Sequence, residues 1–147
     1  MPIPMLDAGV VIAQLKRHVT LLQSIEGSAS LEYVLKHGAR TTPAAFVVPL
    51  AENPSDNQLS STAVRQRVET SFAVMVCVKD FSDARGATAL KQGLMPVRQQ
   101  VLAALIGFSP LPQSDVITHA KGSLLQIKSG VLIWQDHFKV GFYRSSQ

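Results

Sequence analysis

The longest regular alternation of hydrophobic and polar positions lies between Val64 and Lys79. Its side chains alternate with the two-residue period of a strand that turns one face inward. The inward positions are Val68, Thr70, Phe72, Val74, Val76 and Val78. Fully extended, the segment would span roughly 50 Å, whereas a compact chain of this length is roughly 38 Å across. The strand therefore either breaks near its start or projects from the globule and pairs with something outside it.

The two halves of this segment differ in polarity, because its first four residues are polar and basic and its second half is apolar. We expect Phe72–Val78 to lie in the core, and Val64–Thr70 to form an arm together with the preceding loop. That loop, Glu52–Thr62, is rich in Pro, Asn, Asp and Ser, which predicts an exposed and mobile connection. The pattern thus predicts a protruding β-hairpin arm over residues 52–67.

Two segments have the period of amphipathic helices. Asp7 is suited to cap a first helix that runs to about Ser24. Pro96 fits only the first turn of a helix, which predicts a second main helix over Leu94–Ile106 with Gly107 as its terminator.

Shorter apolar runs predict the remaining elements. Pro49 confines the far end of one strand to an edge or a bend, and Ser129-Gly130 is the expected turn of a second hairpin. A turn is also expected over Asp80–Gly86. The predicted elements are a short extra helix at Leu31–His37 and strands at Ala44–Leu50, Lys121–Lys128 and Val131–Arg144.

The order of these elements is helix, helix, strand, strand, helix, strand, strand. This order predicts an α+β fold with a mainly antiparallel sheet of four to five strands, and with the helices, two main ones and the short extra one, on one face of it. The length favours a single domain over residues 1–147.

Composition adds two constraints. Charged residues make up only 16% of the chain, which mildly favours oligomerisation, and the net charge of +4 comes from scattered residues rather than a polybasic tract. The single cysteine, Cys77, excludes an internal disulfide and fits a reducing cytoplasm. The N-terminus lacks the features of a signal peptide, and no apolar stretch is long enough to span a membrane. We therefore expect a soluble protein that stays where it is made.

The sequence offers no catalytic, cofactor-binding or metal site. The four histidines share no metal-ligand spacing. Asp136 and His137 are adjacent on a predicted strand, so they point to opposite faces and cannot form a catalytic pair; a bulge or bend is the favoured interpretation. Trp134 is expected to be a core or interface anchor rather than a base-stacking platform. We therefore expect a protein that is not an enzyme.

Several segments, in order, resemble the tail terminator, or tail completion, proteins of tailed bacteriophages. The more specific parts are the pairing of the AAFVVPL strand with the VRQR-led strand and the late WQDHF. Phe108 departs from the family pattern, which prefers tryptophan before Ser-Pro. The segments are Thr42–Asn53, Ala63–Asp80, Asp83–Leu90, Val97–Pro110 and Gly130–Arg144.

The resemblance implies a structural virion protein that assembles as a ring, usually a hexamer, on the head-proximal end of the tail tube. It implies that the ring stops tube polymerisation, docks the head-to-tail connector and meets the sheath if the tail is contractile. DNA would pass through its channel without sequence-specific binding. The protein would reside in the virion tail, and in the host cytoplasm during assembly.

The arm is the expected subunit interface, because a projecting hairpin can offer a neighbour backbone hydrogen bonds. Alternation puts Arg65, Arg67 and Glu69 on the opposite face from Val68 and Thr70, where they would contact an adjacent subunit or face the channel. A solvated strand edge protected by charge is the alternative. The expected interface residues are Val64, Arg65, Arg67, Val68 and Glu69, with Trp134 as an anchor.

Three other functions remain open. Another phage neck or baseplate adaptor of related fold would share the ring and the lack of an active site. A small nucleic-acid-binding domain would need a contiguous basic face and salt-dependent affinity. A small enzyme would need a cleft with convergent polar groups.

Overall fold

The computed structural model describes residues 3–37, 41–79, 93–128 and 130–146. The expected turn at Asp80–Gly86 lies outside these residues, as does Ser129. The elements are α1 (Ala8–His18), β1 (Ser24–Gly27), α2 (Ser28–His37), β2 (Ala44–Pro54), β3 (Arg65–Lys79), α3 (Met95–Leu105), β4 (Thr118–Lys128) and β5 (Val131–Ser145).

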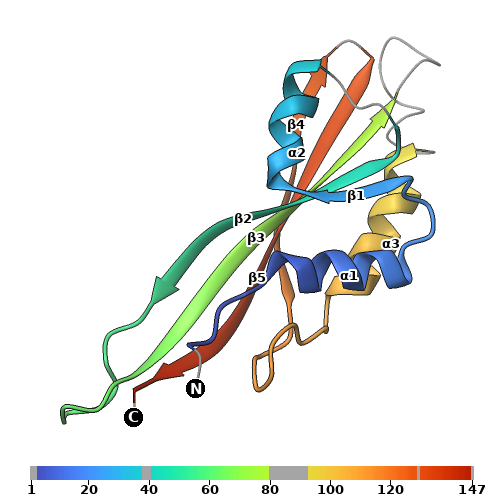
Figure 1. Ribbon diagram of the computed structural model, residues 1–147. Coiled ribbons are helices and arrows are strands. Elements are labelled where there is room, and N and C mark those ends of the chain that lie inside the picture. The colour runs from blue at the N-terminus through green and yellow to red at the C-terminus, as the bar shows by residue number, and fades with distance from the viewer. Residues whose placement is uncertain (1–2, 38–40, 80–92, 129, 147) are drawn as a thin grey trace.

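The five strands form one mixed sheet in the order β1-β2-β3-β5-β4 (Figure 1). β1 pairs with β2 in parallel, and every other neighbouring pair is antiparallel. The α+β class and the mainly antiparallel sheet are therefore confirmed, whereas the sequence pattern gave no indication of β1.

The first helix is shorter than predicted. The Asp7 carboxylate caps it by accepting a hydrogen bond from the Gly9 amide at 2.8 Å, as expected, but the helix ends at His18 rather than near Ser24. Val19 has an extended backbone, and the amides of Thr20 and Leu21 donate to the side chain of Gln100 on α3. The chain then extends into β1, which pairs with β2. These contacts with α3 and β2 end the helix before its apolar period ends.

The second main helix agrees with its prediction, since α3 begins after Leu94 and ends before Ile106. Gly107 follows with a φ of 89°, a left-handed conformation that glycine adopts without strain. The short helix α2 starts at Ser28, three residues before the predicted start at Leu31.

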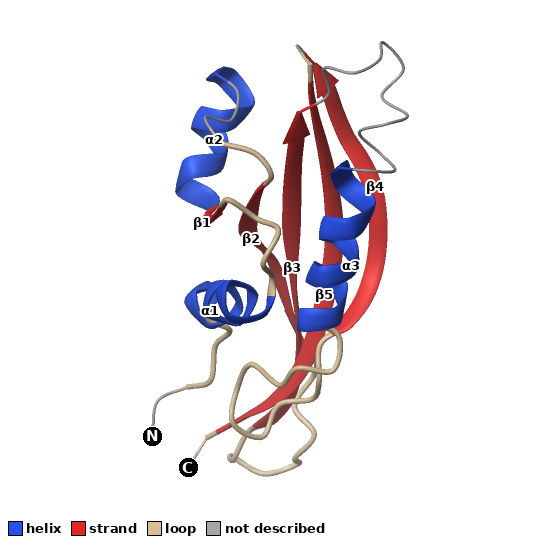
Figure 2. Cartoon of the chain, turned by 90° about the vertical axis from the view of Figure 1, so that its right-hand side faces the viewer, coloured by secondary structure: helices blue, strands red, loops and turns tan. Residues whose placement is uncertain are grey.

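The prediction that the helices lie on one face of the sheet is wrong, because they cover both faces. The front face, which carries Phe72, Val74 and Val76 of β3, is covered by α1 and α3 and holds the larger hydrophobic core. The back face packs against α2, where Leu31 meets a second cluster that includes Cys77. Figure 1 shows α2 on one side of the strands and α1 and α3 on the other, and Figure 2 shows α3 in front of the sheet.

The long strand β3 is continuous. All of its fifteen residues pair with β5, from Arg65 opposite Ser145 to Lys79 opposite Val131, and they extend over roughly 50 Å. The register shift in this region lies in β2, between Pro49 and Ala51. The strand therefore does not break, and its first half projects past the helices (Figure 1).

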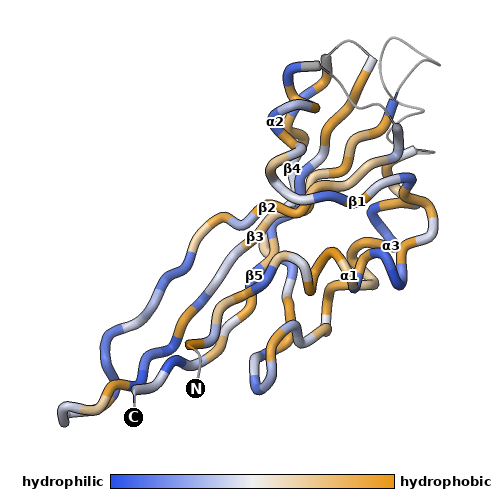
Figure 3. Tube along the Cα trace, in the orientation of Figure 1, coloured by the Kyte–Doolittle hydropathy of each residue, from blue (hydrophilic) through white to orange (hydrophobic). Residues whose placement is uncertain are grey.

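The projecting part has three strands, because β5 follows β3 along its whole length. We call this part the arm and define it as residues 51–71 and 139–145. Its tip is the connection between β2 and β3, residues 55–64. Hydrophilic residues gather along the arm ends of β2 and β3, whereas hydrophobic residues dominate beneath the helices (Figure 3).

Candidate functional site

The two faces of the arm differ in exposure. On the front face, Val68 and Thr70 are buried, with 0% and 4% of their surface exposed. On the back face, the side chains of Arg65 and Glu69 are exposed and that of Arg67 is half-buried. The expected separation of these side chains onto two faces is confirmed, and β3 is an inner strand of the arm, flanked by β2 and β5.

Two of the residues expected at the interface take part in packing within the subunit. Val68 is fully buried, opposite Phe142 of β5, so its side chain supports the arm from inside. Val64 is half-buried. Its amide donates to the Ser146 hydroxyl at 2.8 Å, and its carbonyl accepts from the Ser146 amide at 2.9 Å. Val64 thus ties the start of the arm to the C-terminal end of the chain.

The back face of the arm carries a cluster of two arginines on one tyrosine. The guanidinium carbon of Arg65 lies 4.3 Å from the ring centre of Tyr143, and that of Arg67 lies 5.4 Å from it. Arg67 also donates a hydrogen bond to the Asp115 carboxylate, and this bond raises the pKa of its guanidinium. A β-carbon at Gly141 would overlap that guanidinium. The glycine therefore lets Arg67 lie flat across β5.

The tip of the arm is organised by its own hydrogen bonds, which the prediction of a mobile loop did not include. The Asn57 side chain accepts from the amides of Leu59 and Arg65 at 3.1 and 2.9 Å, and it donates to the Ala63 carbonyl at 3.0 Å. The Ser55 hydroxyl accepts from the amide of Arg67 at 2.9 Å. Asn and Ser side chains often close turns in this way. The residue types of this loop therefore could have predicted its internal hydrogen bonds.

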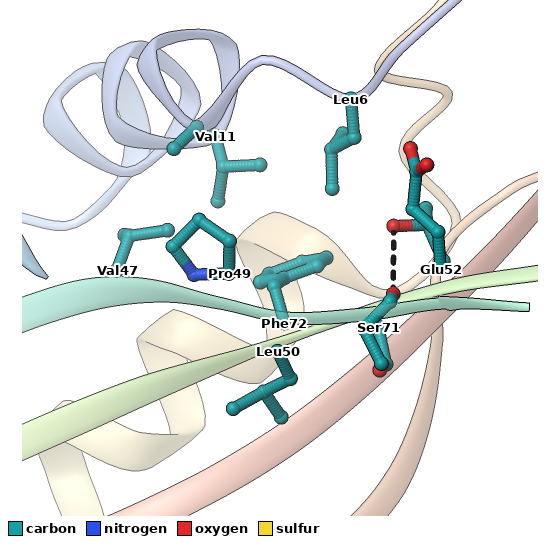
Figure 4. A pocket seen from close by; sticks show the side chains of 11 residues that line it. Leu6, Val11, Val47, Pro49, Leu50, Glu52, Ser71 and Phe72 are labelled. Carbon is teal, nitrogen blue, oxygen red and sulfur yellow. Dashed lines mark hydrogen bonds between the residues drawn. The ribbon is translucent and has the colours of Figure 1, made fainter.

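A cavity of about 300 Å³ lies where the arm joins the body. Leu6 and Val11 point into it from the N-terminal side, and Pro49 and Phe72 line it from the sheet (Figure 4). Leu50, the extra residue at the register shift, points away on the other side of the strands. The cavity is thus apolar toward the body and bordered by the polar side chains of Glu52 and Thr70 toward the arm.

A buried ionic cluster fastens α3 to the body of the sheet. Asp136 is fully buried, and its carboxylate accepts two hydrogen bonds from Arg98, at 2.7 and 2.8 Å. His119 Nε2 lies 2.9 Å from the same carboxylate. Burial alone would raise the pKa of Asp136, but the hydrogen bonds with Arg98 and His119 outweigh it and hold the pKa below its ordinary value.

This cluster corrects the interpretation of the Asp136–His137 pair. β5 keeps a continuous register with β3 through both residues, so the expected bulge or bend is not in β5. It lies in β4, between His119 and Lys121, opposite them. As predicted, Asp136 does not pair with His137, whose Nε2 lies 3.1 Å from Gln135 Oε1. Sequence reasoning missed His119 and Arg98 because they come from other elements.

Trp134 lies beside this cluster. It is half-buried and packs against the larger core, with the Arg98 guanidinium carbon 4.8 Å from its ring centre. Trp134 thus anchors α3 to the sheet within the subunit.

The described residues contain no group of three or more His, Cys, Asp or Glu side chains that could hold a metal ion. Cys77 is buried, and burial raises the pKa of its thiol to about 11. Among the helices of the described part of the chain, none has the length and apolarity to cross a membrane.

Comparison with known proteins gives one result that covers the whole chain. The family model described as "Phage tail terminator protein" matches residues 1–147. No curated protein matches the chain significantly.

Proposed function

This chain belongs to the phage tail terminator family, and on that premise we propose that it forms a ring that caps the head-proximal end of a tail tube. Its family makes it a structural protein of the phage tail, which acts together with other tail and head components. The ring would end polymerisation of the tube and offer a docking surface to the head-to-tail connector. The whole-chain family match is the observation that carries this proposal.

The physical requirement for such a cap is a contact that closes on itself. Tube subunits stack head to tail without limit, whereas a ring whose rotation closes has no free lateral surface. We propose a hexamer that binds the tail tube protein on one side and the connector on the other, and the sheath where the tail is contractile. DNA would pass through the channel without sequence-specific contacts, and no catalytic step is required.

The back face of the arm is the surface that we propose for the contact between adjacent subunits. Arg65 and Glu69 are exposed there with opposite charges. Tyr143, which lies opposite Arg67 on β5, is 39% exposed. Charged and aromatic side chains of this kind favour specific contacts. Val68 would support this surface from the front face of the arm. Trp134 would contribute indirectly, by holding α3 against the sheet.

The function is tested by mixing the purified protein with assembled tail tubes and imaging them by negative stain. A terminator should decorate only one end of each tube and should prevent further growth when tube subunits are added. Binding at the opposite end, or binding to isolated connector without any binding to tube, would instead identify another neck or baseplate adaptor.

Shortening residues 52–67 to a tight turn tests the role of the arm in ring formation. The shortened monomer should fold, because the core lies in the other half of β3, but it should no longer form rings. Light scattering measures the mass of both proteins. Rings of unchanged mass after the deletion would show that the arm is not the subunit interface.

A further inference from the structure

The front face of the arm is crossed by the N-terminal segment, residues 3–7, which lies beside β5 before α1 begins (Figure 1). Arg144 of β5 fixes this segment, since its Nε donates to the Pro4 carbonyl at 2.9 Å. Leu6, two residues further along the chain, packs against the larger core and lines the cavity at the arm base. The N-terminal segment is thus held at the arm by Arg144 and at the body by Leu6.

The same guanidinium also binds β2. Its Nη2 and Nη1 donate to the two carboxylate oxygens of Glu52, at 2.7 and 3.2 Å. β3 lies between β5 and β2, with Gln66 opposite Arg144 and Thr70 opposite Glu52. The line from Arg144 to Glu52 therefore passes over the position of Val68, so one side chain connects both outer strands of the arm and the N-terminal segment. We call these three partners, Arg144, Glu52 and the Pro4 carbonyl, the arm clamp.

The arm clamp is shielded more than an ordinary surface ion pair. The Arg144 side chain is only 17% exposed, and its guanidinium carbon lies 5.4 Å from the ring centre of Phe142. A two-pronged contact between arginine and a carboxylate fixes geometry as well as charge. The clamp is therefore suited to hold strand positions, which a single exposed pair does poorly.

Hydrogen bonds also hold the back face of the arm and its tip. Arg67 bonds to Asp115 on the back face, and the Asp115 amide donates to the Gly141 carbonyl at 2.8 Å. Asn57 joins both sides of the tip. Ties on both faces and at the end leave little of the arm to be ordered by a partner.

We infer that Arg144 is a positioning residue that holds the arm extended in the free subunit, so that the arm meets its partner already ordered. A segment that is ordered before binding avoids the loss of conformational entropy that a disordered segment undergoes on binding. The part of this inference that concerns the free subunit does not depend on the proposed ring. The part that concerns the partner rests on the proposed function.

Hydrogen exchange of the free, full-length subunit tests the inference. The protein is kept dilute enough to be monomeric by light scattering. Amides of Arg65–Ser71 should be protected in the wild-type monomer. The Arg144→Ala substitution should speed their exchange by about tenfold, since hydrogen bonds to charged groups are the stronger ones and local opening sets exchange. Amides of Phe72–Val78 should keep their wild-type rates.

Three matched variants separate positioning from general stability. Glu52→Gln removes the carboxylate but leaves the bond to Pro4, so exchange in the arm should rise by a smaller factor than with Arg144→Ala. Arg144→Lys should not restore protection, because an ammonium cannot reproduce the planar fork. Glu32→Gln breaks the exposed pair with Lys36 on α2, at 3.2 Å, and should leave the arm unchanged.

Two results would overturn the inference. One is wild-type arm amides that exchange at unprotected rates in the monomer and gain protection only in the assembled form. The other is an equal acceleration of arm and core amides in Glu52→Gln, which would make the clamp a contributor to global stability alone. The unprotected rates in the monomer and the rates in Glu52→Gln are both measured without ring formation, so a failure of the proposed function in the tube experiment remains distinguishable.

Discussion

The two halves of β3 share one continuous ladder of hydrogen bonds but differ in what covers them. Phe72–Val78 has α1 and α3 over its front face and α2 over its back face. Arg65–Ser71 buries Val68 and Thr70 on the front face and exposes Arg65 and Glu69 on the back face. The first arrangement stabilises the fold by burial on both sides, and the second leaves one side of an ordered sheet available to a partner.

This difference implies that substitutions along one strand should separate into two classes. Changes in the half under the helices should act on the free energy of unfolding. Changes on the back face of the arm should act on assembly with little effect on folding. The predictions below test this division, from the largest expected change in stability to the smallest.

Phe72→Ala should have the largest effect on stability. Phe72 is 1% exposed and stacks on Phe138 with ring centres 5.3 Å apart. Truncation of a buried aromatic side chain destabilises a domain by about 3–5 kcal/mol, because it loses burial and leaves a cavity. Urea unfolding of the purified variant measures the change. A loss below about 1 kcal/mol would contradict the view that this half of β3 is the core.

Asp136→Asn should rank second and should depend on pH. Removing one partner of a buried ion pair costs about 3 kcal/mol, because it leaves Arg98 without its counter-charge. The pKa of Asp136 is lowered in the folded state, so its contribution is present above the pKa of the unfolded chain, about 3.9, and is lost as the pH falls through the lower folded pKa. The wild type should therefore lose its advantage over the variant under strongly acidic conditions.

Thermal unfolding at neutral pH and at about pH 2.5 measures this convergence. The variant Asp115→Asn is the matched control, because it removes the exposed partner that Arg67 of the arm binds in the connection between α3 and β4. It should shift the midpoint little at either pH, because exposed ion pairs contribute about 0–1 kcal/mol. A constant difference between wild type and Asp136→Asn across this range would show that the carboxylate charge does not stabilise the core.

Val68→Ala should fall between the two classes. Val68 is fully buried but lies in the arm, away from the cover of α3. Losing its two methyl groups should destabilise by about 1–2 kcal/mol by burial alone. Urea unfolding should show a smaller loss than for Phe72→Ala, with the same single transition. A separate early transition would show that the arm unfolds independently of the body.

The pattern of the sequence predicted the elements whose signal is local. The period along β3, the Asp7 cap, and the Pro96 and Gly107 boundaries of α3 depend only on neighbouring residues, and the structure confirms them. β1 has only four residues and exists through its pairing with Ala44–Val47. Nothing in its own composition distinguishes it from a loop.

Long-range placement could not be predicted in the same way. The apolar stripe of a helix indicates that one side is buried, but it does not identify the sheet face that the helix covers, so the position of α2 was wrong. Asp136 binds Arg98 and His119 from other elements, and no spacing rule links these positions. The same limit hid the arm clamp, because Arg144 reaches Glu52 and Pro4 only after the strands align.

Arg65→Glu should have the smallest effect on folding and a large effect on assembly. Arg65 is exposed and contacts the ring of Tyr143, a contact that contributes about 0.5–1 kcal/mol at such a site. Reversing its charge should disrupt complementary charges at the proposed subunit contact, so light scattering should show monomers where the wild type forms rings. Lys16→Glu makes the same charge change on the exposed side of α1 and should leave the rings intact. Equal loss of rings in both variants would mean that net charge, rather than the back face of the arm, controls assembly.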